Sequence, residues 1–254
     1  MLSGVVLVLV PTGLISLPSL YVIGVALISS TTFICEIFLL YTALSEGHAS
    51  DIMPIVGGVA ALTTALCAYQ WLYTDLPRAV VPGFVLMVIG MFLISRFRLT
   101  WRQRRLVVLA GIFFGVTAFL TKLVFLEANF LNGFFWTRMT YVLGALLLLT
   151  VSANRRAIFH GYSGSSSGTK WLVLCGKMLS GTAGVLVLLA ISLGSVSIVQ
   201  ALTGLQFVFL LLIAFLFRGR FPGVLGGELH PAGFRHKLVG IISIMFGLAL
   251  LFLF

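Results

Sequence analysis

Residues 43–57 read ALSEGHASDIMPIVG, and residues 190–204 read AISLGSVSIVQALTG. Aligned with an offset of 147 positions, the two stretches share five identical residues within fifteen positions. The matching pairs are Ala43/Ala190, Ser45/Ser192, Gly47/Gly194, Ser50/Ser197 and Gly57/Gly204. Farther along the chain the offset becomes 157, because Gly83 and Gly90 align with Gly240 and Gly247. This recurrence in one order predicts two copies of one structural unit.

The composition excludes a soluble enzyme. Of 254 residues, 60% are hydrophobic and only 9% are charged, and the mean hydropathy is +1.18. A soluble domain carries roughly 25% charged residues, so this chain has too few to cover a surface that faces water. The lipid bilayer is therefore the expected solvent.

Long apolar runs predict membrane-spanning helices. A crossing needs about 20 apolar residues, and the runs lack the ten-residue alternation of a membrane barrel. The predicted spans are 19–44, 50–73, 80–95, 106–126, 133–152, 170–192, 196–217 and 238–254, and residues 2–17, interrupted by Pro11, count as a partial span. The expected fold class is an all-α polytopic membrane protein with about nine helices.

Basic residues fall on one side of the predicted membrane. The loops 96–105, 153–170 and 218–237 together hold 12 lysines and arginines, whereas the opposite side has Arg78 alone. The positive-inside rule makes these three loops cytoplasmic and places the C-terminus outside. The same rule accounts for the net charge of +10, so we expect no binding to nucleic acid.

The two copies are expected to be inverted relative to each other, because each unit holds an odd number of helices. Inverted repeats are the architecture of many secondary transporters. The copies divide the chain into a first repeat at 1–95, an Arg-rich connector at 96–105 and a second repeat at 106–254. Shifted back by 147, the helices at 106–126 and 133–152 would fall before or across residue 1. The first repeat therefore lacks its first helix.

Ionisable residues inside apolar runs are the first candidates for a substrate cavity, because burying each costs at least ~2.5–3.5 kcal/mol. Glu36 and Lys177 are predicted to lie ~12 and ~10 Å from the cytoplasmic face at 1.5 Å per residue, so we expect them to pair. Lys122 and Arg138 lie near the outer boundary, and we expect Glu127 to neutralise at least one of them. Snorkelling of these side chains to the interface is the alternative.

A polar stripe marks the predicted helix 196–217. Ser197, Gln200, Thr203 and Gln206 recur every three residues. In a lipid-surrounded helix such a stripe faces either a water-filled cavity or a neighbouring helix through hydrogen bonds. The first alternative adds Gln200, Thr203 and Gln206 to the candidate cavity.

The sequence carries no enzyme signature. It lacks an HExxH pair, a Gly-rich phosphate loop and a Ser/His/Asp set. All four histidines fall in predicted loops, and the three cysteines fit no zinc spacing. We therefore expect neither enzymatic activity nor a bound metal or cofactor.

Several of these stretches resemble the EamA-type carriers of the drug/metabolite transporter superfamily. The resemblance rests on YTALSEGHASDIMPI at 41–55, LYTDLP at 72–77 and FWTRM at 135–139, where the family places an arginine, here Arg138. The second copy matches at 190–199, with Ala201 in place of the proline, and Asp75 stands where the family has Glu. The resemblance implies ten helices in two inverted five-helix repeats around a central cavity. The family usually keeps both termini cytoplasmic, which differs from the orientation that the charges predict.

The expected function is secondary transport of small metabolites across the cytoplasmic membrane by alternating access. The candidate cavity holds three cations and two anions, which favours an anionic or zwitterionic solute such as an amino acid. Two alternatives remain open, a flippase for a lipid-linked substrate and an integral membrane protein that transports nothing. The expected partners are a small-molecule substrate and membrane lipids. The sequence specifies neither the coupling ion nor the oligomeric state.

Overall fold

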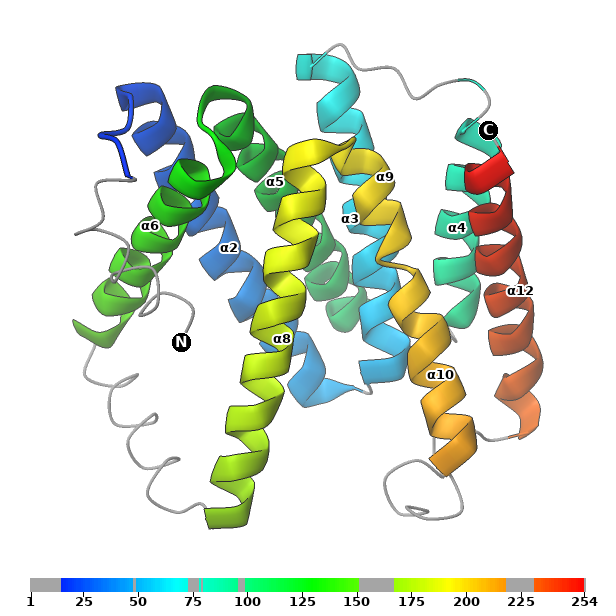
Figure 1. Ribbon diagram of the computed structural model, residues 1–254. Coiled ribbons are helices and arrows are strands. Elements are labelled where there is room, and N and C mark those ends of the chain that lie inside the picture. Colours follow the sequence, from blue (N-terminus) through cyan, green and yellow to red (C-terminus); the bar gives the residue numbers. More distant parts are fainter. Residues whose placement is uncertain are drawn as a thin grey trace. The chain divides into compact units, whose positions relative to one another are not determined.

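The computed structural model describes residues 15–47, 49–72, 78, 80–95, 99–150, 167–217 and 231–253, and within them it is all-helical, without strands (Figure 1). The helices are α2 (Leu20–Glu46), α3 (Ala49–Leu72), α4 (Val81–Ile94), α5 (Trp101–Glu127), α6 (Phe130–Thr150), α8 (Ser167–Leu193), α9 (Val196–Leu202), α10 (Leu205–Phe217) and α12 (Pro231–Leu253). The predicted partial span at 2–17 and most of the loops 153–170 and 218–237 lie outside the described residues.

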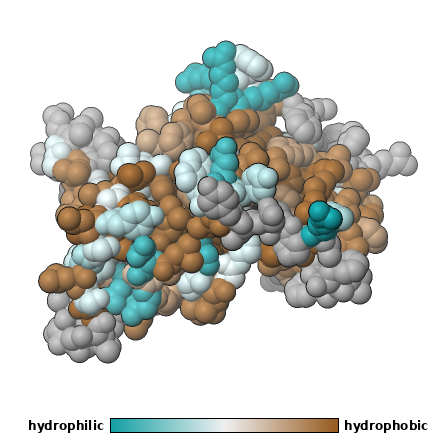
Figure 2. Space-filling view, turned by 90° about the horizontal axis from the view of Figure 1, so that it is seen from above, coloured by the Kyte–Doolittle hydropathy of each residue, from teal (hydrophilic) through white to brown (hydrophobic). Residues whose placement is uncertain are grey.

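Among the described residues, four helices are long and apolar enough to cross a membrane, namely those at Leu20–Glu46, Asp51–Leu72, Trp101–Glu127 and Trp171–Leu193. Shorter apolar helices occur at Val81–Ile94, Val196–Phe209 and Lys237–Leu250. Large apolar side chains such as Leu172 and Leu186 are exposed, and the face in Figure 2 is mostly hydrophobic, with polar residues gathered in a few places. These features indicate a multi-pass membrane protein.

The helix bounds follow the offset seen in the sequence. Helix α2 begins at Leu20 and ends at Glu46, and α8 begins at Ser167 and ends at Leu193, so both bounds differ by 147 positions. Helix α3 begins at Ala49 and α9 at Val196, which is again 147 positions later. The helix pairs therefore start in the same register.

Several predicted helix starts are wrong. Helix α12 begins at Pro231, inside the segment predicted as the loop 218–237, and α8 begins at Ser167 rather than at 170. Helix α5 begins at Trp101, inside the segment predicted as the Arg-rich loop 96–105. Thr100 and Gln103 start it as a capping box: the Thr100 N–H donates to Gln103 Oε1 at 2.9 Å, and the Gln103 N–H donates to Thr100 Oγ1 at 3.3 Å.

The segment 196–217, predicted as one helix, is interrupted between α9 and α10. The N–H groups of Gly204, Gln206 and Phe207 each bond the carbonyl three residues earlier, which tightens the backbone into a 3₁₀-type turn.

The chain divides into two compact units, and each takes helices from both predicted repeats. Unit 1 comprises residues 1–34 and 120–194, and unit 2 comprises residues 35–119 and 195–254. The division falls within α2, after Ile34, and within α5, after Phe119, so each of these two helices contributes to both units. Contiguous repeats and compact units are therefore different divisions of this chain.

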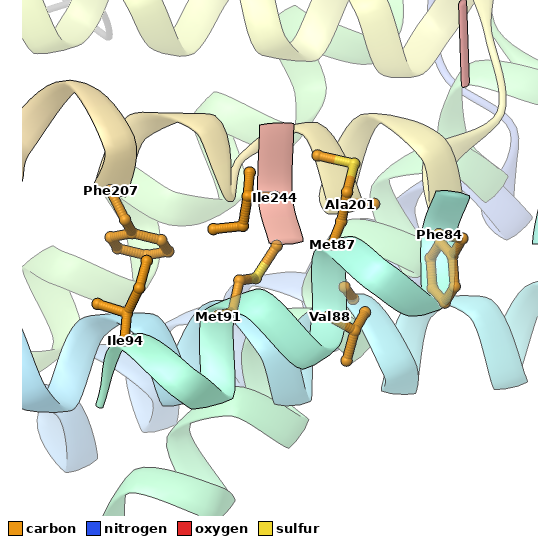
Figure 3. Close-up of a cluster of buried hydrophobic side chains, with 9 residues drawn as sticks. Phe84, Met87, Val88, Met91, Ile94, Ala201, Phe207 and Ile244 are labelled. Atoms are coloured by element: carbon orange, nitrogen blue, oxygen red, sulfur yellow. The ribbon is translucent and has the colours of Figure 1, made fainter. Parts of the chain in front are cut away.

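Unit 2 has a core built around α4. Met87 and Met91 are fully buried, and they pack with Phe207 and Ile244 from α10 and α12 (Figure 3). Helix α5 packs on α3 through glycines: a Cβ on Gly115 would lie 2.6 Å from the Ala60 carbonyl oxygen. Small residues allow such close backbone approach between helices in membranes.

Helices α4 and α12 lie side by side and run antiparallel (Figure 1). A Cβ on Gly90 would lie 2.7 Å from the Gly240 carbonyl oxygen and 2.9 Å from the Ile244 nitrogen. A Cβ on Gly247 would lie 2.7 Å from the Gly83 carbonyl oxygen and 2.9 Å from the Met87 nitrogen. With the offset of 157, the counterpart of Gly90 is Gly247, that of Gly240 is Gly83, and that of Ile244 is Met87.

Unit 1 packs α6 against the first half of α2. The Ser30 hydroxyl donates to the Thr140 carbonyl at 3.0 Å, and the Thr140 hydroxyl lies 3.1 Å from the Ala26 carbonyl. A Cβ on Gly144 would lie 2.7 Å from Ile34 Cδ1 and 2.9 Å from Ser30 Oγ. Hydroxyl–carbonyl bonds and a glycine therefore fix this helix pair.

Candidate functional site

Glu36 is a buried carboxyl of unit 2. It projects from α2 and is only 5% exposed. Its carboxyl group is hydrogen-bonded to the Thr117 side chain of α5, and its Oε2 has no hydrogen-bond partner among the described residues. A half-satisfied carboxyl in an apolar protein is costly, so it is the strongest candidate for a functional group in this unit.

The hydrogen bond between Glu36 and Thr117 can form both when the carboxyl is ionised and when it is protonated. The Thr117 hydroxyl also lies 2.8 Å from the carbonyl oxygen of Phe113 in its own helix. A hydroxyl has one proton and two lone pairs. An ionised Glu36 therefore needs that proton, whereas a protonated Glu36 donates to Thr117 Oγ1 and leaves the hydroxyl proton to Phe113.

Lys177, the predicted partner of Glu36, lies on α8 in unit 1, and its side chain is exposed. Glu36 belongs to unit 2. The pair is therefore a prediction about how the two units meet, and it stays a prediction.

The polar stripe on α9 and α10 is not continuous, contrary to the prediction. Ser197 and Gln200 are buried, at 3% and 2% exposed, whereas Gln206 is exposed. Thr203 lies at the turn between the helices, and its hydroxyl donates to the Gln200 carbonyl at 2.6 Å. The tight turn changes the register after Thr203, so Ser197 and Gln200 are the buried members of the stripe.

Lys122 binds backbone carbonyls rather than a carboxylate. Its Nζ lies 2.9 Å from the Ile191 oxygen, 3.2 Å from the Ser192 oxygen and 2.9 Å from the Gly194 oxygen. These carbonyls end α8, where the helix dipole favours a cation. The ammonium group uses its three donors on them.

Arg138 stacks on aromatic rings. Its Cζ lies 5.3 Å from the centroid of Phe134 and 5.4 Å from that of Tyr141, within the range of cation–π attraction. Tyr141 is fixed in turn by Phe33, whose ring is 4.6 Å away and nearly parallel, and by Ser29 at 3.0 Å. The Arg138 Nε is buried without a hydrogen-bond partner among the described residues.

The predicted neutralisation of Lys122 or Arg138 by Glu127 is not found. Glu127 is exposed, and the acidic residue that forms an ion pair with a base of α5 is Glu46, which pairs with Arg102. The physical reason is that both bases have other partners: Lys122 binds carbonyls, and Arg138 lies over rings.

Three residues that contact these groups or the helix ends beside them were not predicted: Thr117, which bonds Glu36, Tyr141, which lies beside Arg138, and Gln103, which caps α5. The Thr-x-x-Gln spacing at 100–103 is a capping-box signature that was present in the sequence. Hydroxyls within apolar runs are a weaker signal, because most of them bond carbonyls of their own helix. Within the described parts of the chain, no group of three His, Cys, Asp or Glu residues is placed to hold a metal ion.

Comparison with known proteins adds no relative. No protein-family model and no curated protein matches this chain. The functional argument therefore rests on the residues and their geometry.

Proposed function

We propose that this protein is a secondary membrane transporter that moves small metabolites by alternating access. The observation that carries the proposal is the packing of α4 on α12. The contacts of Gly90 reappear at Gly247 with each partner replaced by its counterpart. Contacts exchanged in this way are those of a two-fold axis.

The direction of that axis supports an inverted repeat. Helices α4 and α12 are antiparallel, so a two-fold axis that exchanges them runs perpendicular to both. If these helices cross the bilayer, the axis lies in the membrane plane and the two copies have opposite topology. Carriers with inverted repeats move between two conformations in which the copies exchange roles.

The proposed architecture is two inverted repeats of about five helices. The common starts of α2 with α8 and of α3 with α9 support it. It is the arrangement of the EamA-type carriers that the sequence resembles. We place the protein in the cytoplasmic membrane, with membrane lipids and a small-molecule substrate as its partners.

Glu36 is the group that we assign to the transport pathway. A buried carboxyl with one unpartnered oxygen can take up a proton or a cationic group. Lys177 on α8 is the cation that we propose for it, because α8 is the counterpart of α2. A solute that bears a carboxylate would compete with Glu36 for Lys177, which favours an anionic or zwitterionic substrate.

Flux in proteoliposomes tests the proposal. A panel of amino acids, nucleosides and lipid phosphates is first screened for thermal stabilisation, because a ligand of the folded state raises the melting temperature by mass action. The selected solute is then loaded into vesicles that contain the wild type, Glu36→Gln or Lys177→Met. Both variants are expected to lose flux while keeping the folded yield.

Thr182→Val is the matched control for Lys177→Met, because Thr182 is an exposed polar residue of the same helix and its hydroxyl donates to the Met178 carbonyl within that helix. Its flux should equal that of the wild type. Folded protein without flux of any solute would contradict the proposal and favour a protein that transports nothing. Stabilisation by lipid phosphates alone would favour a flippase.

A further inference from the structure

Two short links join counterpart helices in this fold. The first link connects α2 to α3 around Gly47, and the second connects α8 to α9 around Gly194. In each case a long helix ends and its last carbonyls need partners, since the final turn of a helix leaves them without intrahelical donors. Helix α5 binds one carbonyl at the first link and three at the second, near its two ends.

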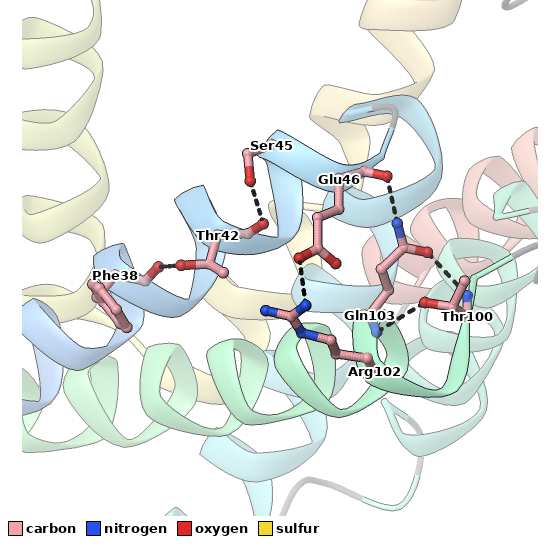
Figure 4. A network of polar contacts seen from close by, with 7 residues as sticks. All are labelled: Phe38, Thr42, Ser45, Glu46, Thr100, Arg102 and Gln103. Atoms are coloured by element: carbon pink, nitrogen blue, oxygen red, sulfur yellow. Dashed lines mark hydrogen bonds and ion pairs between the residues drawn. The ribbon is translucent and has the colours of Figure 1, made fainter.

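The first link is held at the start of α5. Gln103 Nε2 donates to the Glu46 carbonyl, and Arg102 Nη1 lies 3.3 Å from Glu46 Oε1 (Figure 4). The capping box with Thr100 fixes the Gln103 side chain, which is 7% exposed. The amide is therefore already oriented toward the end of α2.

The second link is held near the end of α5. Lys122 donates to the carbonyls of Ile191, Ser192 and Gly194. With the offset of 147, these residues are the counterparts of Leu44, Ser45 and Gly47 in the first link. One helix thus binds the same part of both repeats.

The spacing of the two contacts fits the two sides of a membrane. Gln103 and Lys122 are 19 positions apart in α5, or ~28 Å at 1.5 Å per residue. The hydrocarbon core is ~30 Å thick. One contact therefore lies at each boundary.

We propose that α5 is a strut with a latch at each end, and that the protein opens to one side of the membrane when the latch on that side is released. Lys122 is then a positioning residue for the outer gate rather than a group that binds substrate. Gln103 has this role at the cytoplasmic gate. The inference rests on the proposed alternating access, but the latches can be tested without a substrate.

Thiol accessibility is the test. In a variant without Cys35, Cys67 and Cys175, one cysteine replaces Ile191, which is 3% exposed, and in a second variant one replaces Ala43, which is fully buried. An impermeant maleimide is applied from outside for position 191, and from the cytoplasmic side, in inside-out vesicles, for position 43. Labelling rates then report how often each gate is open.

Lys122→Met is expected to raise the labelling rate at position 191 about tenfold or more, because a single hydrogen bond to a charged group accounts for such a factor. It should leave position 43 unchanged. Gln103→Leu should raise the labelling rate at position 43 and leave the rate at position 191 unchanged. Lys122→Arg, which keeps charged donors, should restore slow labelling at position 191, and Lys122→Gln should be intermediate.

Arg105→Gln is the matched control for Gln103→Leu. Arg105 is exposed and contacts the Trp101 ring of its own helix, so its loss should change neither rate. Equal rates in Lys122→Met, Lys122→Gln and the wild type would overturn the latch, whether or not the vesicles transport a solute. An equal rise at both positions would also overturn it, since that outcome indicates general loosening. If the labelling rates follow the predicted pattern but no solute is transported, the transport proposal is contradicted and the latch proposal is not.

Discussion

The hydroxyl of Ser243 in α12 donates a hydrogen bond to the carbonyl oxygen of Leu86 in α4, at 2.8 Å. The two residues are 157 positions apart, so each is the counterpart of the other. They lie midway between the glycines that align at the same offset. In the proposed two-fold arrangement, this bond marks the place where the axis passes between the two helices.

The first prediction concerns the glycines on either side of that bond. Gly90→Ala and Gly247→Ala should each lower the free energy of unfolding by about 1–3 kcal/mol, the usual cost of overpacking. Both new methyl groups would meet backbone atoms closer than 3.0 Å. The two costs should be equal within error, because the contacts are counterparts. Thermal unfolding in detergent measures them.

Gly184→Ala serves as the control, since nothing lies within 4 Å of a Cβ at that position of α8. It should leave the melting temperature unchanged or raise it, because alanine favours a helix over glycine. A large difference between Gly90→Ala and Gly247→Ala would argue against the two-fold relation.

The second prediction uses Gly204, where the close contact is a flexible side chain. A Cβ there would approach Met91 Cε, and the thioether can turn aside because methionine has three rotatable bonds. Gly204→Ala should therefore cost less than Gly90→Ala in the same melting experiment. An equal or larger cost would show that the turn between α9 and α10 itself needs glycine.

The third prediction concerns Glu36 and Thr117. Thr117→Val removes the hydrogen-bond partner of a buried carboxyl and should destabilise the protein by about 1–3 kcal/mol. The double variant Glu36→Met/Thr117→Val should recover most of that loss, because both polar groups are then gone. A double-mutant cycle of unfolding measurements gives the coupling. Additive costs would mean that the two side chains do not interact.

The fourth prediction concerns the aromatic setting of Arg138. Arg138→Lys should destabilise unit 1 by about 0.5–2 kcal/mol, because the planar guanidinium stacks on rings and an ammonium does not. Tyr141→Leu removes one of the rings. In that background Arg138→Lys should destabilise the protein less than it does in the wild type. Melting temperatures of the four proteins in this cycle provide the measurement. Full stability of Arg138→Lys would show that only the charge matters.

The fifth prediction concerns orientation. The positive-inside rule predicts that Arg104, near the start of α5, and Arg155 both lie on the cytoplasmic side. Cysteines at these positions should therefore stay unlabelled when intact cells are treated with an impermeant thiol reagent, and should react after the cells are opened. Labelling in intact cells would reverse the orientation. Arg155 lies outside the described residues, so it tests the loop by sequence position alone.

The positions of the helices were largely predictable, because lipid requires long uninterrupted apolar runs. The exceptions have specific causes. The predicted apolar run begins at 106 because arginines precede it. Arginine is a good helix former, and α5 begins earlier, at Trp101. The turn at Thr203 and Gly204 follows from hydrogen bonds to the third preceding residue, which apolar periodicity does not reveal.

The candidate site was predictable only in part. Glu36 stood out because a carboxyl inside an apolar run needs an explanation, and it is indeed buried. The partners of Lys122 were not predictable, because they are backbone carbonyls. Every residue has a backbone carbonyl, so the sequence does not indicate which of them bind a lysine. Charge pairing with Glu127 was the natural expectation from sequence, but a helix terminus offers a cation the same stabilisation without a carboxylate.

The packing of α4 on α12 also sets an order of events during synthesis. Gly90 and Gly247 are 157 residues apart, so at ~5–20 residues per second α4 leaves the ribosome roughly 8–30 s before its partner. During that interval its glycine face has no matching surface. Helix α4 has only 14 residues, fewer than the ~20 of a full crossing, and before α12 is made it can pack on α3, which it contacts. We expect the newly made chain to be most sensitive to membrane-bound proteases in this interval, and the arrival of α12 to end that sensitivity.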